Sequence, residues 1–248
     1  MTTTTAARRA RTTGRRHIPF RIVAVLIALA FLVVFGVWQS ILTPWVTFPD
    51  ATDHGWTRTP ELHRYTDSAS AAAMAAVGLG ALVLALRPVG RSALVAWVAA
   101  MLTVVGMSSG VSVILQQHQG VGGALVQAVA TVALTAVPFV LLHPERRLVL
   151  RGGASGAAGP TGVARAGLVA IALAGIVLTL GAVARRLTGV VAESPLEDDV
   201  LGYVVLGLAL ILGSSICLTG RAGWRTLAAI LGAVSLYGIV GGLSLAFG

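Results

Sequence analysis

The stretch ASAAAMAAVGLGALVLAL at residues 69–86 contains no charged side chain. It ends at the basic turn RPVGR (87–91), and a second apolar run, SALVAWVAAMLTVVGMSSGVSVIL, follows at residues 92–115. About 20 apolar residues in a helix, at about 1.5 Å per residue, are enough to cross the ~30 Å hydrocarbon core of a bilayer. The two runs therefore predict two transmembrane helices joined by a short basic turn.

Apolar runs of this kind recur along the whole chain. Hydrophobic residues make up 56% of the 248 residues and charged residues 11%, with a mean hydropathy of +0.87. A soluble domain of this composition would expose much apolar surface to water. Each run should be a helix, because lipid offers no partner for backbone groups and the alternation typical of a barrel is absent. We expect an all-α membrane protein, a seven-transmembrane-helix bundle with spans at 22–42, 69–86, 92–115, 121–142, 166–184, 200–219 and 226–248.

The arginines predict the orientation of the bundle. All 18 basic residues are arginine, and a cytoplasmic N-terminus leaves only Arg58, Arg64, Arg185 and Arg186 outside. The same choice leaves only one of the nine carboxylates, Glu145, inside. We therefore expect the N-terminus in and the C-terminus out, as the positive-inside rule requires, in a multi-pass protein of the bacterial plasma membrane. The net charge of +9 favours anionic lipid as a partner over nucleic acid, because the basic loops lack interleaved aromatic residues.

The chain divides into a tail and one membrane domain. Residues 1–21 are rich in Thr and Arg and lack acidic residues, which predicts a disordered basic cytoplasmic tail. Residues 22–248 form a single transmembrane domain. Within it a shift of 132 residues relates Glu61 to Glu193 and Asp67 to Asp199. We expect a parallel 3+1+3 internal repeat, with units at 22–115 and 166–248 joined by a linker helix at 121–142. The alternative is chance matching in a chain rich in small apolar residues.

Two glycine pairs obey the same shift. Gly106 and Gly110 correspond to Gly238 and Gly242. Glycines four residues apart share one face of a helix and let a neighbouring backbone approach closely, so we expect both pairs to pack helices together. A kink is expected at Pro138, because proline cannot donate the helical hydrogen bond, and Thr135 is the candidate to bond the freed backbone groups.

Ionisable residues are missing where many transporters need them. No Asp, Glu, Arg or His lies near the middle of any predicted span, which argues against an ion pump or a proton-coupled carrier. The single cysteine, Cys217, excludes an intrachain disulfide or a thiol redox pair. The absence of lysine excludes a retinal Schiff base of the rhodopsin type.

Candidate chemistry lies at the outer ends of the helices. Two carboxylates in a partly apolar cleft can be divided into an acid and a base by their environments. The repeat would place such pairs at a cleft, so the candidate catalytic residues are Glu61, Asp67, Glu193 and Asp199. The alternative is that these carboxylates complement the dipoles of helix starts. The candidate ligand-binding residues are Arg58, Arg64, Arg185 and Arg186, which also offer salt-bridge partners.

The outer loops also contain a histidine and carboxylate set. His54, His63, Asp67 and His118 could together hold zinc or another first-row metal. Their spacing matches no metal-binding motif, and the alternative is a solvated polar loop. No other cofactor is expected.

Three classes of function fit these features. The first is a non-catalytic membrane subunit or scaffold that binds lipid, partner helices or a further copy of itself, favoured by the small packing residues. The second is a membrane-embedded enzyme that acts on a lipid-like or isoprenoid substrate with the outer carboxylates. In gross plan it is similar to the small seven-helix membrane terpene cyclases, although an aromatic content of 6% is low for stabilising a carbocation. The third is a permease for a neutral small solute.

Overall fold

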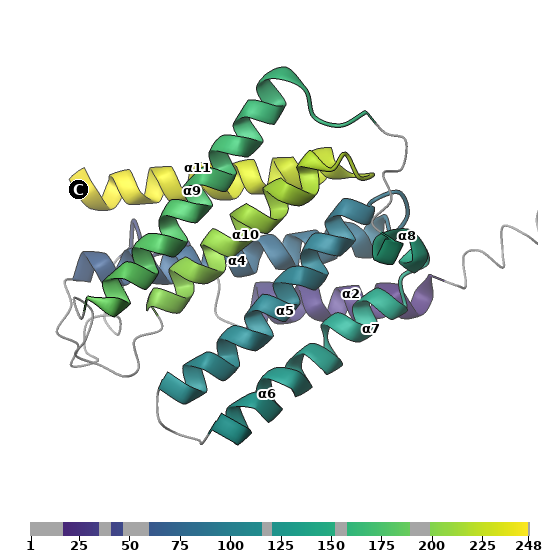
Figure 1. The fold of residues 1–248 in the computed structure, drawn as a ribbon, viewed down its shortest axis with the longest axis horizontal. Helices are drawn as coiled ribbons and strands as arrows, with labels where there is room; N and C mark the ends of the chain where they lie inside the picture. Colours follow the sequence, from purple (N-terminus) through teal and green to yellow (C-terminus); the bar gives the residue numbers. More distant parts are fainter. Residues whose placement is uncertain are drawn as a thin grey trace, which may run out of the picture.

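The computed structural model describes residues 17–34, 41–46, 60–115, 121–151, 158–188 and 199–247. Every regular element in these ranges is a helix (Figure 1), which confirms the all-α class. The elements are α2 (Ile18–Leu29), η1 (Ala30–Val34), α4 (Pro60–Leu86), α5 (Ser92–Leu115), α6 (Val121–Leu134), α7 (Ala136–Leu141), α8 (Arg146–Arg151), α9 (Gly162–Leu187), α10 (Asp199–Leu218) and α11 (Trp224–Phe247).

Five stretches in the described part of the chain are long and apolar enough to span a membrane. They are Asp67–Leu86, Ser92–Val111, Val121–Leu141, Gly162–Arg185 and Trp224–Ser244. Two further apolar helices, Ile18–Val34 and Gly202–Leu218, are shorter. The protein is therefore membrane-embedded.

Helix ends differ from the expected spans mainly on the polar side of each run. The first helix begins at Ile18 instead of residue 22, and the second begins at Pro60 instead of residue 69. Hydropathy marks the part of a helix that lies in lipid and says little about polar turns beyond it. Proline at the first helical position explains the start of α4, since its missing N–H has no helical partner to lose there.

Two of the apolar helices are interrupted. α2 continues as the π-helical turn η1, and the fourth apolar run breaks between α6 and α7 at Thr135. The break is the kink expected from Pro138, which has no N–H to donate to the carbonyl of Leu134. The Thr135 hydroxyl donates instead to the Thr131 carbonyl, at 2.7 Å. The expected kink is confirmed, but Thr135 does not serve the carbonyl that the proline frees.

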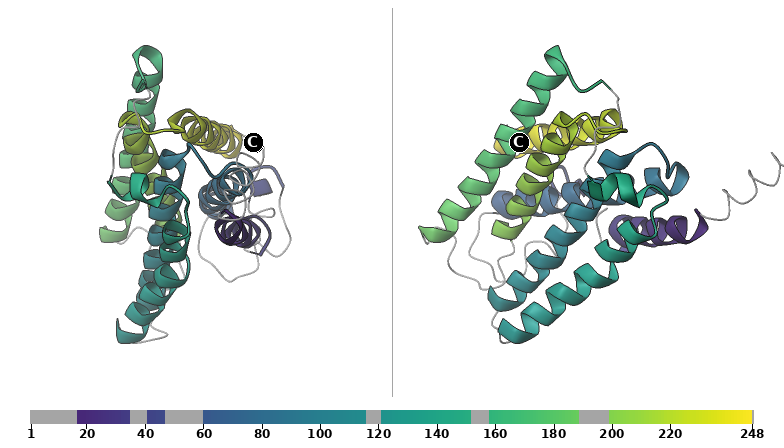
Figure 2. Two further views of the ribbon diagram at one scale, coloured as in Figure 1. Left: turned by 90° about the vertical axis from the view of Figure 1, so that its right-hand side faces the viewer. Right: turned by 45° about the vertical axis from the view of Figure 1, so that its right-hand side comes forward.

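The helices form two layers that cross each other (Figure 2). One layer contains α9, α10, α5 and the α6–α7 pair, and the other contains α2, α4 and α11. Between the layers α4 and α11 pack against α10 and α5. Trp97 of α5 is fully buried there, and its indole N–H donates to the carbonyl of Ala209 on α10, at 3.0 Å. Such a bond satisfies the one polar atom of a large buried ring.

Glycines allow the closest helix contacts. At Gly175 of α9 an added Cβ would lie 2.6 Å from the carbonyl oxygen of Gly207 on α10. At Gly110 of α5 it would lie 2.8 Å from the Cβ of Ala128 on α6, and at Gly106 it would lie 2.9 Å from Val132. At Gly175 and Gly110 the obstacles include backbone carbonyl oxygens, those of Gly207 and Ala124, so a larger side chain would have to move a helix. Small residues therefore set the spacing of α9 from α10 and of α5 from α6.

Candidate functional site

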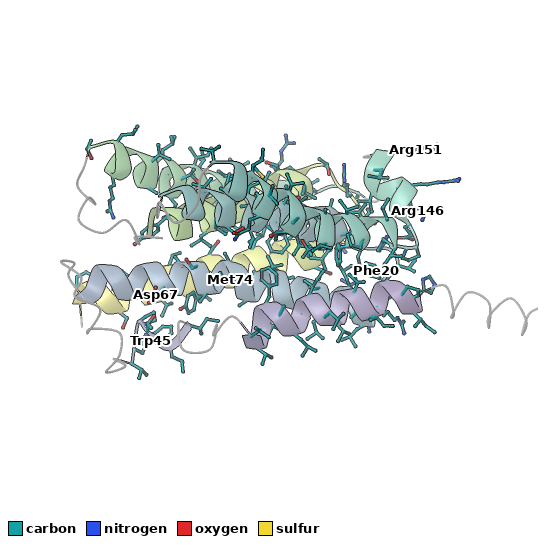
Figure 3. All side chains as sticks on the ribbon, turned by 90° about the horizontal axis from the view of Figure 1, so that it is seen from below. Phe20, Trp45, Asp67, Met74, Arg146 and Arg151 are labelled. Atoms are coloured by element: carbon teal, nitrogen blue, oxygen red, sulfur yellow. The ribbon has the colours of Figure 1, made fainter. Side chains whose placement is uncertain are left out.

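Segments far apart in the sequence meet at one end of the bundle, called here the arginine-rich end. It comprises the start of α2, the turn 87–91, residues 142–151, residues 158–161 and the turn 219–223. The two turns contact each other, because a Cβ at Gly223 would lie 2.8 Å from the Cα of Arg91. Just after the first turn, the Ala93 N–H donates to the Ala222 carbonyl at 3.0 Å. The Trp224 indole N–H donates to the Ala158 carbonyl at 3.1 Å. In Figure 3 Arg146 and Arg151 lie at this end, while Trp45 and Asp67 lie at the opposite end.

His143 is the buried polar centre of the arginine-rich end. The N–H of Glu145 donates to His143 Nδ1, at 3.1 Å. Nε2 must then carry the proton, and it donates to the Pro88 carbonyl at 2.7 Å. The imidazole also meets the ring of Phe20 edge-on, with 4.7 Å between centroids. Burial lowers the pKa of His143, and the two hydrogen bonds together fit only the neutral ring.

Glu145 closes the same cluster. Its carboxylate accepts a hydrogen bond from the backbone N–H of Gly90, at 2.9 Å. Gly90 has φ +72°, a conformation that favours glycine. The one carboxylate expected on the basic side therefore holds the α4–α5 turn against the segment after α7.

The predicted catalytic carboxylates are only partly within the described structure. Glu61 lies in the first turn of α4, and Asp199 is the first residue of α10. The side chains of both, and the whole of Glu193, lie outside what the structure describes. The Asp67 side chain is half-buried on α4 and has a partner. α4 and α10 pack against each other. Because three of the four carboxylate side chains are not described, the acid and base pairing stays a prediction.

The predicted ligand-binding and metal-binding residues are also only partly within the described structure. Arg58, His54 and His118 lie outside the described residues, and Arg64 and His63 are placed only as positions on α4. Arg185 is exposed near the end of α9, beside Arg186, whose side chain is not described. Within the described ranges no three His, Cys, Asp or Glu side chains come together in a way that could hold a metal ion. The full metal set is therefore untested.

The second glycine pair lies in different surroundings from the first. At Gly238 an added Cβ would meet nothing within 4 Å, whereas at the neighbouring Gly241 it would lie 3.3 Å from Pro44. Gly242 is half-buried. One turn away, the Tyr237 hydroxyl donates to the Ile41 carbonyl at 2.8 Å, and its ring meets Trp45 at a centroid distance of 5.7 Å. This half of α11 is thus joined to the segment 41–46.

Two apolar openings on the side of the bundle are features that the sequence reasoning missed. A groove of about 410 Å³ runs between α4 and α11, lined largely by alanines such as Ala72, Ala76, Ala229 and Ala233. We call it the α4–α11 groove. The alanine-rich run 71–76 is the signal for it, because small side chains leave a hollow between larger neighbours.

The second opening, of about 310 Å³, lies between α2, α5 and α6. Both helix interruptions line it: η1 contributes Ala30 and Phe31, and the break contributes Leu134 and Thr135. Leu134 and Leu26, which also line it, are exposed. A π-helical turn often marks a functional position in a helix. The pattern of the sequence could not place around one cavity two irregularities that lie more than 100 positions apart.

Comparison with known proteins adds no family to these observations. Protein-family models, curated proteins and solved structures were searched, and none matches this chain.

Proposed function

We propose that the protein is a non-catalytic membrane subunit or scaffold whose helix bundle binds lipid or partner helices. The observation that carries this proposal is the character of the two openings. Both the α4–α11 groove and the cavity between α2, α5 and α6 are lined almost wholly by apolar side chains. They are of the size of ligand sites and are bordered by exposed apolar residues such as Leu79 and Leu134. Such openings suit acyl chains better than polar solutes.

The proposal includes seven crossings with the N-terminus inside. The described parts of the segments expected in the cytoplasm gather at the arginine-rich end, which supports seven crossings. The short helices Ile18–Val34 and Gly202–Leu218 pack within the bundle. At about 1.5 Å per residue they reach most of the way across a ~30 Å core. The membrane we propose is the bacterial plasma membrane, on the positive-inside pattern.

The parallel repeat is also part of the proposal. In a parallel repeat α2 corresponds to α9, α4 to α10 and α5 to α11. The contact of α4 with α11 then corresponds to a contact of α10 with α5, and the structure contains both. The correspondence likewise relates the α2–α4 pair to the α9–α10 pair. These contacts support a pseudo-twofold arrangement of the two units, with α6 and α7 as the linker.

The proposed function can be tested by lipid content. The protein should be extracted with its surrounding bilayer in polymer nanodiscs, and the lipids quantified by mass spectrometry against the bulk membrane. We expect particular lipids to be enriched. The double substitution Ala229→Leu and Ala233→Leu should reduce that enrichment, because both alanines are exposed and line the groove. A lipid composition identical to the bulk, with no stoichiometric protein partner, would contradict the proposal.

One contact favours a second candidate, an enzyme acting on a lipid-like substrate. α4 and α10, which carry Glu61, Asp67 and Asp199, pack against each other, as an acid and base pair across a cleft requires. A deletion strain complemented with Glu61→Gln or Asp199→Asn distinguishes the two functions. A scaffold should tolerate either change, since an amide still caps a helix. An enzyme should lose about 10² to 10⁴ in rate with its folding intact.

A further inference from the structure

Arg91 lies at the mouth of the α4–α11 groove. One N–H of its guanidinium donates to the hydroxyl of Thr226, and Thr226 lines the groove. A guanidinium has five N–H donors, and the bond to Thr226 uses one of them, so donors remain for an anion. The backbone of Arg91 also packs closely against the turn 219–223. A Cβ added at Gly223 would lie 2.8 Å from the Arg91 Cα.

The groove has the length of one membrane leaflet. It runs along α11 from Thr226 to Tyr237, roughly 16 Å at 1.5 Å per residue. Half of a ~30 Å hydrocarbon core is about 15 Å. At the far end the Tyr237 hydroxyl is bonded to the Ile41 carbonyl, and both residues line the groove. The groove therefore begins at a cation at the arginine-rich end and is closed, about one leaflet's length along α11, by the bonded pair of Tyr237 and Ile41.

The charge around the mouth is strongly positive. Two further arginines there have exposed side chains. Arg87 precedes Arg91 by four residues, and Arg225 is next to Thr226 in the sequence. Arg225 lies over the Trp224 ring, with 5.6 Å from its guanidinium carbon to the ring centroid. The carboxylate of Glu145, the acidic residue described at this end, already accepts the Gly90 N–H. Glu145 offsets part of this positive charge, but Arg87, Arg91 and Arg225 outnumber it, so the described side chains around the mouth still favour an anion.

We propose that the α4–α11 groove is a binding site for one anionic phospholipid of the leaflet at the arginine-rich end. Its phosphate accepts hydrogen bonds from Arg91, and one of its acyl chains lies along the alanines of α4 and α11. Arginine suits this role because its planar group bonds phosphate oxygens in pairs. This inference rests on the lipid-binding function proposed above and adds the location, the leaflet and the headgroup charge.

The test is native mass spectrometry of the delipidated full chain in detergent. The probes are phosphatidylglycerol, phosphatidylcholine with the same acyl chains, and inorganic phosphate. We expect phosphatidylglycerol to bind about tenfold more tightly than phosphatidylcholine. Arg91→Gln should bring its affinity down to that of phosphatidylcholine, and Arg91→Lys should restore part of the difference. The pair Ala229→Leu and Ala233→Leu should weaken both lipids, because it fills the groove without adding volume to the buried core.

Arg165→Gln is the matched control, since Arg165 is an exposed arginine on α9 and lines a different surface. It should leave phosphatidylglycerol binding unchanged. An equal loss in this control would overturn the site, because it would show attraction to surface charge alone. Binding of inorganic phosphate in place of lipid would also overturn it. Equal affinity for both lipids would overturn the headgroup assignment while leaving lipid binding intact, whereas the absence of any bound lipid would remove both proposals.

Discussion

His143 shows how one buried side chain can make stability depend on pH. Its neutral form is the only form that both accepts from the Glu145 N–H and donates to Pro88. Burial lowers its pKa below the ordinary 6.5, more than the Pro88 hydrogen bond and the charge of Glu145 raise it, and the nearby His17 lowers it further. The unfolded chain therefore takes up this proton at a higher pH than the folded chain does.

We expect the protein to lose stability as the pH falls below about 6.5, where unfolded His143 becomes charged, toward the lower pKa of the folded state. Above pH 7 this contribution is constant. Melting temperatures in detergent from pH 8 to pH 5 measure the effect. His143→Gln should flatten the part of the curve that His143 causes, and an unchanged pH profile in this variant would rule out the histidine as its source.

At the scale of the helix, α9 and α10 make the closest contact at a glycine. A Cβ added at Gly207 would come nearer to the facing helix than one added at any other glycine in the described ranges. At Gly207 an added Cβ would clash with the Thr179 hydroxyl oxygen and lie 2.7 Å from the Gly175 carbonyl. Gly181 is exposed on α9, and an added Cβ there would meet nothing within 4 Å. The same substitution should therefore have opposite effects at the two positions.

Gly207→Ala should destabilise the protein by about 1 to 3 kcal/mol, because it overpacks a helix interface. Gly181→Ala should stabilise α9 by about 0.5 to 1 kcal/mol, because alanine loses less backbone entropy than glycine in a helix. Unfolding titrations with sodium dodecyl sulfate in mixed micelles would measure both. A Gly207→Ala variant as stable as wild type would show that α9 can move away from α10 at little cost.

Hydropathy predicted the helices well and their contacts less well. The apolar runs located every long helix of the described structure, but the polar start of α4 at Pro60 lay outside the predicted span. The contact of Gly175 with Gly207 was missed, although Gly175 and Thr179 are small residues four positions apart. Small residues are frequent here, and spacing alone does not say which of them meets another helix. The hydrogen bond from the Gly90 N–H to the Glu145 carboxylate joins residues 55 positions apart, and a pattern along one helix carries no information on such pairs.

At the scale of the whole molecule, most of the exposed arginines among the described side chains lie at the arginine-rich end. The exposed side chains of Arg87, Arg146, Arg147, Arg151 and Arg225 all belong to it. In the proposed topology of seven crossings, this end would face the cytoplasm. A reporter that works only in the cytoplasm should then be active when fused after Ser155 and inactive when fused after Gly120 or Gly248. Cytoplasmic activity after Gly248 would mean that one of the short helices does not cross.

The near-exclusive packing of α9 on α10 has a consequence for how the chain is made. α9 leaves the ribosome before its partner, and of the described helices only α11, also later in the chain, offers it another sizeable contact. Its entry into the bilayer must rest on its own solubility in lipid. The span Gly162–Arg185 has a mean hydropathy of 2.4, the highest of the five candidate spans. Once in the bilayer, it offers the shorter α10 a surface on which Gly175 and Thr179 meet Gly207, so the order of synthesis and the distribution of hydropathy favour the same path of assembly.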